Sequence, residues 1–141
     1  MTCFGCNLAN KKENVHVVLE DDYVCCILDI DPFNEGHVLI LPKNHVRFFD
    51  EFDDNTANSV MIAAKKLSTA IKNVFNPDGI TVCQNGGVFD ELTHFHMHVV
   101  PRYKGQNFAE FYSEDVKPLV EKKHDLEETK RKITEMLKVL D

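Results

Sequence analysis

The stretch Thr93-His94-Phe95-His96-Met97-His98-Val99-Val100-Pro101-Arg102 places three histidines in strict alternation with apolar residues. Successive side chains on a β-strand point to opposite faces, so this spacing predicts a strand with all three imidazoles on one face. Phe95, Met97 and Val99 then share the other face, which can be buried. Twice the rise per residue sets the expected spacing of the histidines at about 6.5–7 Å. A helix would spread the same side chains over a wide arc.

Three uses are open for such a row of histidines. It can be the polar face of a half-exposed strand, it can hold a metal ion, or it can carry nucleophilic, acid–base and phosphate-binding functions. Neighbouring positions are rather far apart for all three imidazoles to bind one ion at about 2.0–2.1 Å, although two of them could. The alternation over a continuous apolar face favours a function over a merely solvated strand.

Length and composition indicate one globular domain, and we expect residues 1–141 to form it, with 103–141 as a C-terminal tail and helical extension. The net charge of −7 without a basic run argues against generic nucleic-acid binding, but allows a small anionic substrate. No apolar run approaches the roughly 18–20 residues of a membrane span, and the N-terminus lacks a signal-peptide pattern. The five cysteines then favour a cytoplasmic protein with reduced thiols.

The remaining hydrophobic patterns predict an α+β fold. Further strands are expected over 15–19, 23–28, 37–42 and 80–84, a long amphipathic helix over about 55–75, and a charged C-terminal helix over Leu126 to Leu140. Ser113-Glu114-Asp115 has the pattern of a helix N-terminus, so a further helix is expected to begin there. The sum is a mostly antiparallel five-stranded sheet with one long central helix and a C-terminal helix, the tail being an edge or dimer-contact element.

Two other features have more than one interpretation on their own. Cys3 and Cys6 form a C-x-x-C, which can be half of a zinc site, a redox pair or an accident, although a redox pair usually follows a strand. Asp29 at a strand end can be a solvated turn carboxylate or an acceptor for the vicinal hydroxyls of a ribose.

The run His94–Val100 resembles the signature of the histidine triad (HIT) family, in which histidines alternate with apolar residues. Leu28-Asp29-Ile30, followed by the segment from Gly36 to His45, resembles the upstream half of the same proteins. The resemblance covers most of residues 3–102. It implies the HIT-like fold, a purine nucleotide as substrate and a homodimer. Charge and hydropathy argue against nucleic acid and membrane as partners.

The resemblance implies an enzyme that cleaves the α-phosphate bond of AMP-X, such as a dinucleoside polyphosphate or an adenosine phosphoramidate. His96 matches the nucleophile that forms a nucleotidyl-histidine, oriented by the backbone carbonyl of His94. His98 matches a phosphate-contacting histidine that assists proton transfer, and His37 matches an accessory histidine. The alternative is a nucleotide- or zinc-binding regulatory protein with little turnover.

The resemblance also implies nucleotide-binding residues and a metal site. Asp29 and Ile30 match the ribose region, and Asn85, in preference to Gln84, matches an amide near the phosphate. In relatives with an N-terminal C-x-x-C, a structural zinc ion is held by residues that correspond to Cys3, Cys6, His45 and His94 here.

One segment departs from the family pattern. Many members have Gly-Gln-Ser or Gly-Gln-Thr where this chain has Phe89-Asp90-Glu91. A carboxylate beside a phosphate repels it unless it is protonated or turned away. The handling of the leaving group therefore stays open, and Glu91 is given no role.

Overall fold

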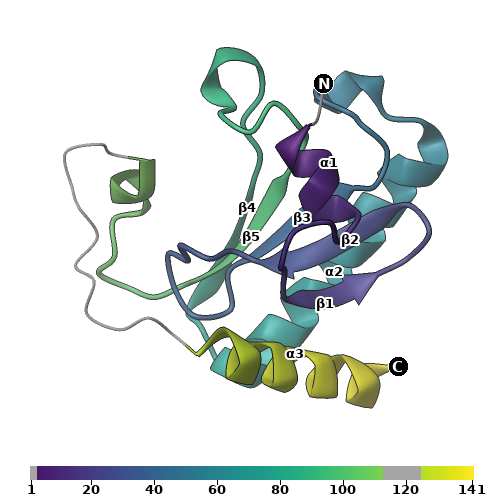
Figure 1. The fold of residues 1–141 in the computed structure, drawn as a ribbon. Helices are drawn as coiled ribbons and strands as arrows, with labels where there is room; N and C mark the ends of the chain where they lie inside the picture. The colour runs from purple at the N-terminus through teal and green to yellow at the C-terminus, as the bar shows by residue number, and fades with distance from the viewer. Residues whose placement is uncertain (1–2, 113–124) are drawn as a thin grey trace.

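The computed structural model describes residues 3–112 and 125–141, and these residues form the expected α+β fold (Figure 1). Their sheet has five strands in the order β1-β2-β3-β5-β4, and every neighbouring pair is antiparallel. The strands are β1 (Val17–Glu20), β2 (Val24–Leu28), β3 (Val38–Pro42), β4 (Gly79–Cys83) and β5 (Met97–Arg102). The helices are α1 (Phe4–Ala9), α2 (Asp54–Phe75) and α3 (Leu126–Leu140), with 3₁₀ turns η1 (Phe49–Glu51), η2 (Gly87–Phe89) and η3 (Phe108–Tyr112).

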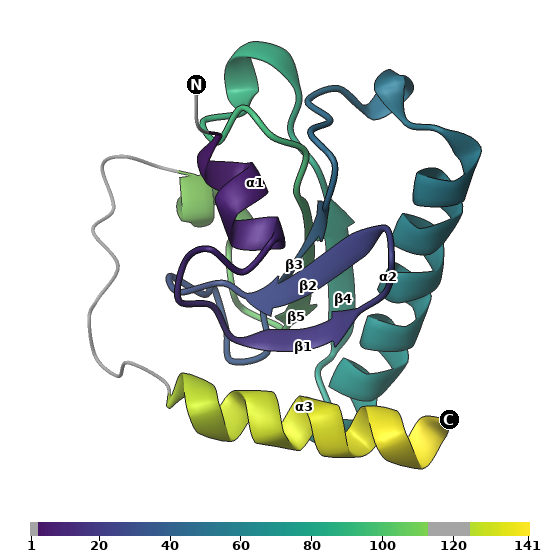
Figure 2. The same cartoon turned by 45° about the vertical axis from the view of Figure 1, so that its right-hand side comes forward.

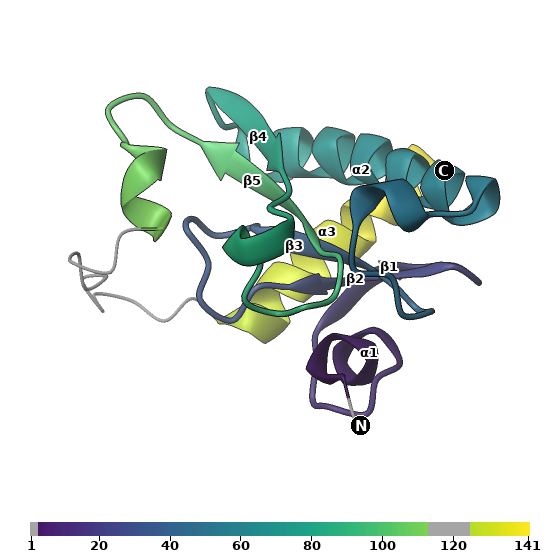
Figure 3. The same ribbon diagram turned by 90° about the horizontal axis from the view of Figure 1, so that it is seen from above.

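Helices cover both faces of the sheet (Figures 2 and 3). On one face α2 and α3 pack together, and their buried side chains join those of the strands in one hydrophobic core. On the other face α1 covers a smaller cluster around β2 and β3. Cys25 belongs to the smaller cluster and Cys26 to the larger one, because successive strand residues face opposite ways.

The long helix lies within one residue of its predicted bounds. Asp53 caps its N-terminus, since Oδ1 accepts a hydrogen bond of 2.7 Å from the backbone N–H of Thr56. Asn76 ends it in the left-handed region at φ 47°. The apolar stripe includes Val60 and Leu67, which are buried against the sheet, as the 3.6-residue period of the hydrophobic residues predicted.

The histidine strand is shorter than predicted, because it begins at Met97 and leaves His94 and His96 ahead of it. The ladder between β3 and β5 ends at the pair Ile40 and Met97. Continued in the same register, it would place Pro42, which has no N–H to donate, opposite Phe95. The Phe95 N–H instead donates to the Val46 carbonyl at 2.7 Å.

The N-terminal region differs from expectation, whereas the C-terminal helix follows it. Helix α1 was not predicted. Helix α3 has the predicted bounds, and it packs against α2 and the edge strand β1 of the same chain. The helix start expected at Ser113-Glu114-Asp115 lies outside the described residues. Within the described residues, no helix is both long and apolar enough to cross a bilayer.

Candidate active site and metal-ligand cluster

A pocket of about 610 Å³ opens on the face of the sheet that α1 covers, where β3 and β5 lie side by side. His98 lines it from β5 and His96 from the residues just before that strand. Asp29 follows β2 and Asn85 follows β4, so both reach the pocket from strand ends. The other lining residues are Leu8, Asp31, Leu39, Phe89, Glu91, Leu92 and Phe111. This volume suits a small organic ligand.

The alternation predicted for the histidine stretch is confirmed. Phe95, Met97 and Val99 belong to the core beneath α2, while His96 and His98 face the pocket. The ring centroids of the two histidines are 5.1 Å apart. The two imidazoles therefore lie next to each other in the same pocket.

The hydrogen bonds of His37 assign the tautomer of His98. The Phe33 N–H donates to His37 Nδ1 at 3.0 Å, so this nitrogen carries no proton. His37 therefore holds its proton on Nε2 and donates it to His98 Nδ1 at 2.9 Å. His98 in turn carries its proton on Nε2. Because His98 lines the pocket, that N–H is a donor for a bound ligand.

Burial shifts the titration of this chain of groups. Burial lowers the pKa of both His37 and His98 to about 4, so both imidazoles are neutral at pH 7. Burial also raises the pKa of Asp29, whose Oδ2 lies 3.4 Å from His37 Nε2. The other oxygen of Asp29 accepts a hydrogen bond of 2.8 Å from the Asp31 N–H, which fixes the carboxyl at the pocket wall.

His96 has the opposite tautomer. Its Nδ1 lies 2.9 Å from the backbone carbonyl of His94, and a carbonyl can only accept, so Nδ1 carries the proton. The lone pair is then on Nε2. The pocket thus has a nucleophilic nitrogen on His96 beside a donor N–H on His98, a combination suited to attack on an electrophilic phosphorus.

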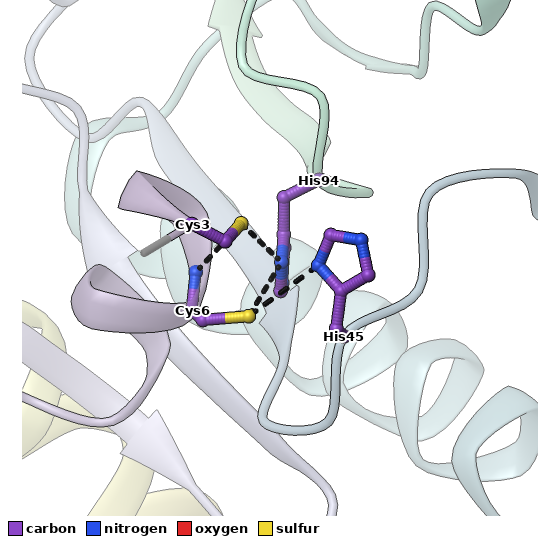
Figure 4. A group of neighbouring side chains, drawn as sticks. All are labelled: Cys3, Cys6, His45 and His94. Carbon is purple, nitrogen blue, oxygen red and sulfur yellow. Dashed lines mark hydrogen bonds between the residues drawn. The ribbon is translucent and has the colours of Figure 1, made fainter. Parts of the chain in front are cut away.

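Cys3, Cys6, His45 and His94 form a second cluster beside α1, with all four ligand atoms within 4.8 Å of one another (Figure 4). His94 Nδ1 lies 3.5 Å from both Sγ atoms, and His45 Nδ1 lies 3.4 Å from Cys6 Sγ. A tetrahedral zinc site with ordinary bond lengths has sulfur-to-nitrogen edges of about 3.6 Å. The four residues expected to bind zinc therefore fit that ion in chemistry and in spacing.

The surroundings of His94 also suit a metal ligand. Its Nε2 donates to the Pro42 carbonyl at 2.9 Å, so the lone pair on Nδ1 faces the two sulfurs. Burial lowers the pKa of His94, which favours the neutral form that binds metals. The backbone carbonyl of this same residue orients His96, so the cluster is joined directly to the pocket.

The structure brings most of the predicted site residues together. Ile30 is 73% exposed beside Asp29 and is not among the residues that line the pocket, and neither is Gln84. Sequence reasoning gave no role to Asp90, which lies 3.7 Å from His96, or to Phe111, whose ring centroid is 5.3 Å from that of His37. No local pattern marked Phe111. Asp90 had been noticed only as a departure from the family.

The sequence model of the HIT domain matches residues 10–105. The chain belongs to the HIT family. An uncharacterised HIT-like protein of Methanocaldococcus jannaschii is 36% identical over 105 residues, which are 73% of this chain and 81% of that protein. The adenosine 5'-monophosphoramidase of Saccharomyces cerevisiae is 32% identical, over 71% of this chain and 62% of its own length.

A solved HIT structure has the same fold. The zinc-bound histidine triad family protein of Mycobacterium smegmatis superposes with a TM-score of 0.80 at 28% identity, and the match covers 100% of this chain and 96% of that one. The predicted membership of the HIT family and the five-stranded α+β architecture are therefore confirmed.

Proposed function

We propose that this HIT protein is a nucleotide hydrolase or transferase that cleaves the α-phosphate bond of AMP-X substrates. X is the amine of an adenosine phosphoramidate or the second half of a dinucleoside polyphosphate such as diadenosine tetraphosphate. The observation that carries the proposal is the unprotonated Nε2 of His96 beside the donor Nε2–H of His98 in one pocket. The similarity to a yeast adenosine 5'-monophosphoramidase supports it.

The reaction divides into two displacements at phosphorus. His96 Nε2 attacks the α-phosphorus, a nitrogen–phosphorus bond forms, and X departs with the electrons of its bond to phosphorus. His98 donates from Nε2 to a phosphoryl oxygen or to X, and His37 holds His98 in that tautomer. Water then attacks the nucleotidyl-histidine, the nitrogen–phosphorus bond breaks, and AMP leaves.

Two of the proposed nucleotide-binding residues, Asp29 and Asn85, line the same pocket, and Ile30 lies beside Asp29. Asp29 presents a carboxyl for the ribose hydroxyls, and the exposed Ile30 beside it offers apolar surface to the base. Asn85 supplies an amide at the opposite strand end. The Phe89-Asp90-Glu91 segment places carboxylates near the phosphate. Asp90 is not expected to repel it, because its buried side chain accepts hydrogen bonds from backbone N–H groups of its own loop.

We also propose that Cys3, Cys6, His45 and His94 hold a structural zinc ion. When bound, the ion joins α1 to the sheet and fixes the segment that carries His96. The zinc-bound relative supports this proposal. Protein purified without chelators should contain about one equivalent of zinc, and Cys6→Ser should lose it while Cys83→Ser, outside the cluster, keeps it. Less than half an equivalent in the unmodified protein would count against the site.

The decisive test of the enzyme proposal is His96→Ala. We expect wild type to hydrolyse a fluorogenic adenosine phosphoramidate or diadenosine tetraphosphate, and the variant to lose at least about 100-fold, roughly 2.7 kcal/mol of transition-state stabilisation. His16→Ala is the matched control, because His16 lies away from the pocket and pairs with Glu127 at 3.2 Å. If wild type turns over neither substrate, or if His96→Ala is as active as wild type, the alternative of a nucleotide- or zinc-binding regulatory protein is favoured.

We further propose a cytoplasmic homodimer. In the described residues β4 pairs only with β5, so its outer edge presents backbone groups on which a second copy could extend the sheet. Val82, 48% exposed, lies on that strand. Sedimentation equilibrium should give twice the monomer mass for wild type and less for Val82→Lys; a wild-type monomer would refute the dimer.

A further inference from the structure

We infer that Asp90 is a positioning residue for the His96 nucleophile. Its buried carboxylate lies on the Nδ1 side of the ring and stabilises the positive charge that His96 gains when Nε2 bonds to phosphorus. This inference rests on the proposed function, because it assigns a role within nucleotidyl transfer at the same site.

The loop is built to hold this carboxylate in place. Asp90 directly follows η2, and its side chain is fully buried. Oδ1 accepts hydrogen bonds from the backbone N–H groups of Leu92 at 3.0 Å and Thr93 at 3.2 Å. Thr93 lies in the left-handed region at φ 57°, and this turn delivers the chain to His94 and His96. The carboxylate and the nucleophile therefore belong to one short, fixed segment.

The carboxylate of Asp90 lies beside the ring of His96. Oδ1 lies 3.7 Å from His96 Nδ1, whose proton is directed to the His94 carbonyl at 2.9 Å. Oδ2 is buried and has no hydrogen-bond partner among the described residues. Leaving a buried carboxylate oxygen without a partner costs stability, so its presence beside a nucleophile calls for a function.

The charge balance of the first displacement supplies that function. The form of His96 that attacks has a proton on Nδ1 and a lone pair on Nε2, so it carries no charge. When the Nε2–phosphorus bond forms and the bond to X breaks, the ring keeps its Nδ1 proton and becomes a cation. The carboxylate stabilises that cation without taking the proton, because preorganised charge favours a state in which charge develops. Attack by water then removes the positive charge.

Asp90→Asn removes the negative charge but keeps the hydrogen bonds of the turn, because the amide oxygen can still accept from the N–H groups of Leu92 and Thr93. We expect kcat for the phosphoramidate to fall by roughly 10- to 100-fold. The dissociation constant for AMP, the zinc content and the melting temperature should stay near wild-type values, a split that a merely structural role would not produce. Asp90→Ser, which also caps the turn without a charge, should show the same loss of kcat.

Asp21→Asn is the matched control. Asp21 Oδ1 accepts the N–H groups of Tyr23 at 2.7 Å and Val24 at 2.8 Å, the same arrangement at a turn away from the pocket. It should keep wild-type kcat. An Asp90→Asn protein with kcat within twofold of wild type would overturn the inference alone. So would loss of zinc, AMP binding or folding in both Asp90 variants. A wild-type protein without turnover would overturn the proposed function and this inference together.

Discussion

At the scale of single residues, Gly5 decides how closely α1 approaches the metal-ligand cluster. A Cβ atom at this position would lie 2.3 Å from Cβ and 2.4 Å from Cγ of His94. Real side chains do not tolerate such distances, so a larger residue must push α1 or the imidazole away. The glycine inside the C-x-x-C is thus needed for close approach, and the two cysteines reach His94 because of it.

We therefore predict that Gly5→Ala weakens zinc binding and destabilises the fold by at least about 1–3 kcal/mol. Competition with a chelator measures the first effect, and thermal melting measures the second. Gly79→Ala is the control, because a Cβ at that position meets nothing within 4 Å. If Gly5→Ala matches Gly79→Ala in both measurements, the close approach is not important.

At the scale of elements, α3 contacts the rest of the chain through one apolar face and through polar contacts with Glu35. Ile133 is fully buried and Leu137 nearly so, both within the core that α2 shares. The Thr129 hydroxyl donates to Glu35 at 2.7 Å, and Lys132 pairs with the same carboxylate at 3.2 Å. The apolar face contributes most, because partly exposed ion pairs are worth little.

Ile133→Ala should accordingly destabilise the protein by about 2–5 kcal/mol, the usual cost of a large-to-small change in a core. Val139→Ala, on the same helix at a position 76% exposed, should change the free energy of unfolding by less than about 0.5 kcal/mol. Urea unfolding followed by circular dichroism compares the two. Equal effects would mean that α3 is not anchored through Ile133.

The elements also show what the sequence could predict. The sheet, α2 and α3 follow from hydrophobic periods that are local in the chain, so their bounds were close to those observed. Helix α1 has six residues, too few for an intrinsic helical signal, and it forms where Cys3 caps it and the cluster holds it. The early end of the β3–β5 ladder depended on Pro42 lying opposite Phe95, a register that the sequence did not reveal.

The same distinction applies to the candidate site. The spacing of the alternating histidines predicted the pocket-facing imidazoles, whereas the four cluster residues were predicted only through the resemblance to HIT proteins with an N-terminal C-x-x-C. The pairing of Asp90 with His96 depends on the left-handed turn at Thr93, and the contact of Phe111 with His37 depends on a segment without any pattern. Such contacts are products of tertiary structure.

At the scale of the whole molecule, burying neutral histidines makes stability depend on pH. His37 and His98 have pKa values lowered to about 4, against about 6.5 in an unfolded chain. Between these values the unfolded state binds more protons than the folded state, so the free energy of unfolding rises with pH. The contribution of these two histidines to the free energy of unfolding is fully present above about pH 6.5. It is lost progressively as the pH falls from about 6.5 toward about 4.

His37→Asn should reduce this dependence, because one of the two protonation sites disappears. With zinc saturating, we expect the slope of unfolding free energy against pH, measured by urea titrations at pH 7, 6 and 5, to fall by up to about 1.4 kcal/mol per pH unit below pH 6. The raised pKa of Asp29 acts in the opposite sense in both proteins, so it largely cancels in the difference. Parallel lines for the two proteins would show that the pKa of His37 is the same in the folded and unfolded states, which would contradict the lowering by burial.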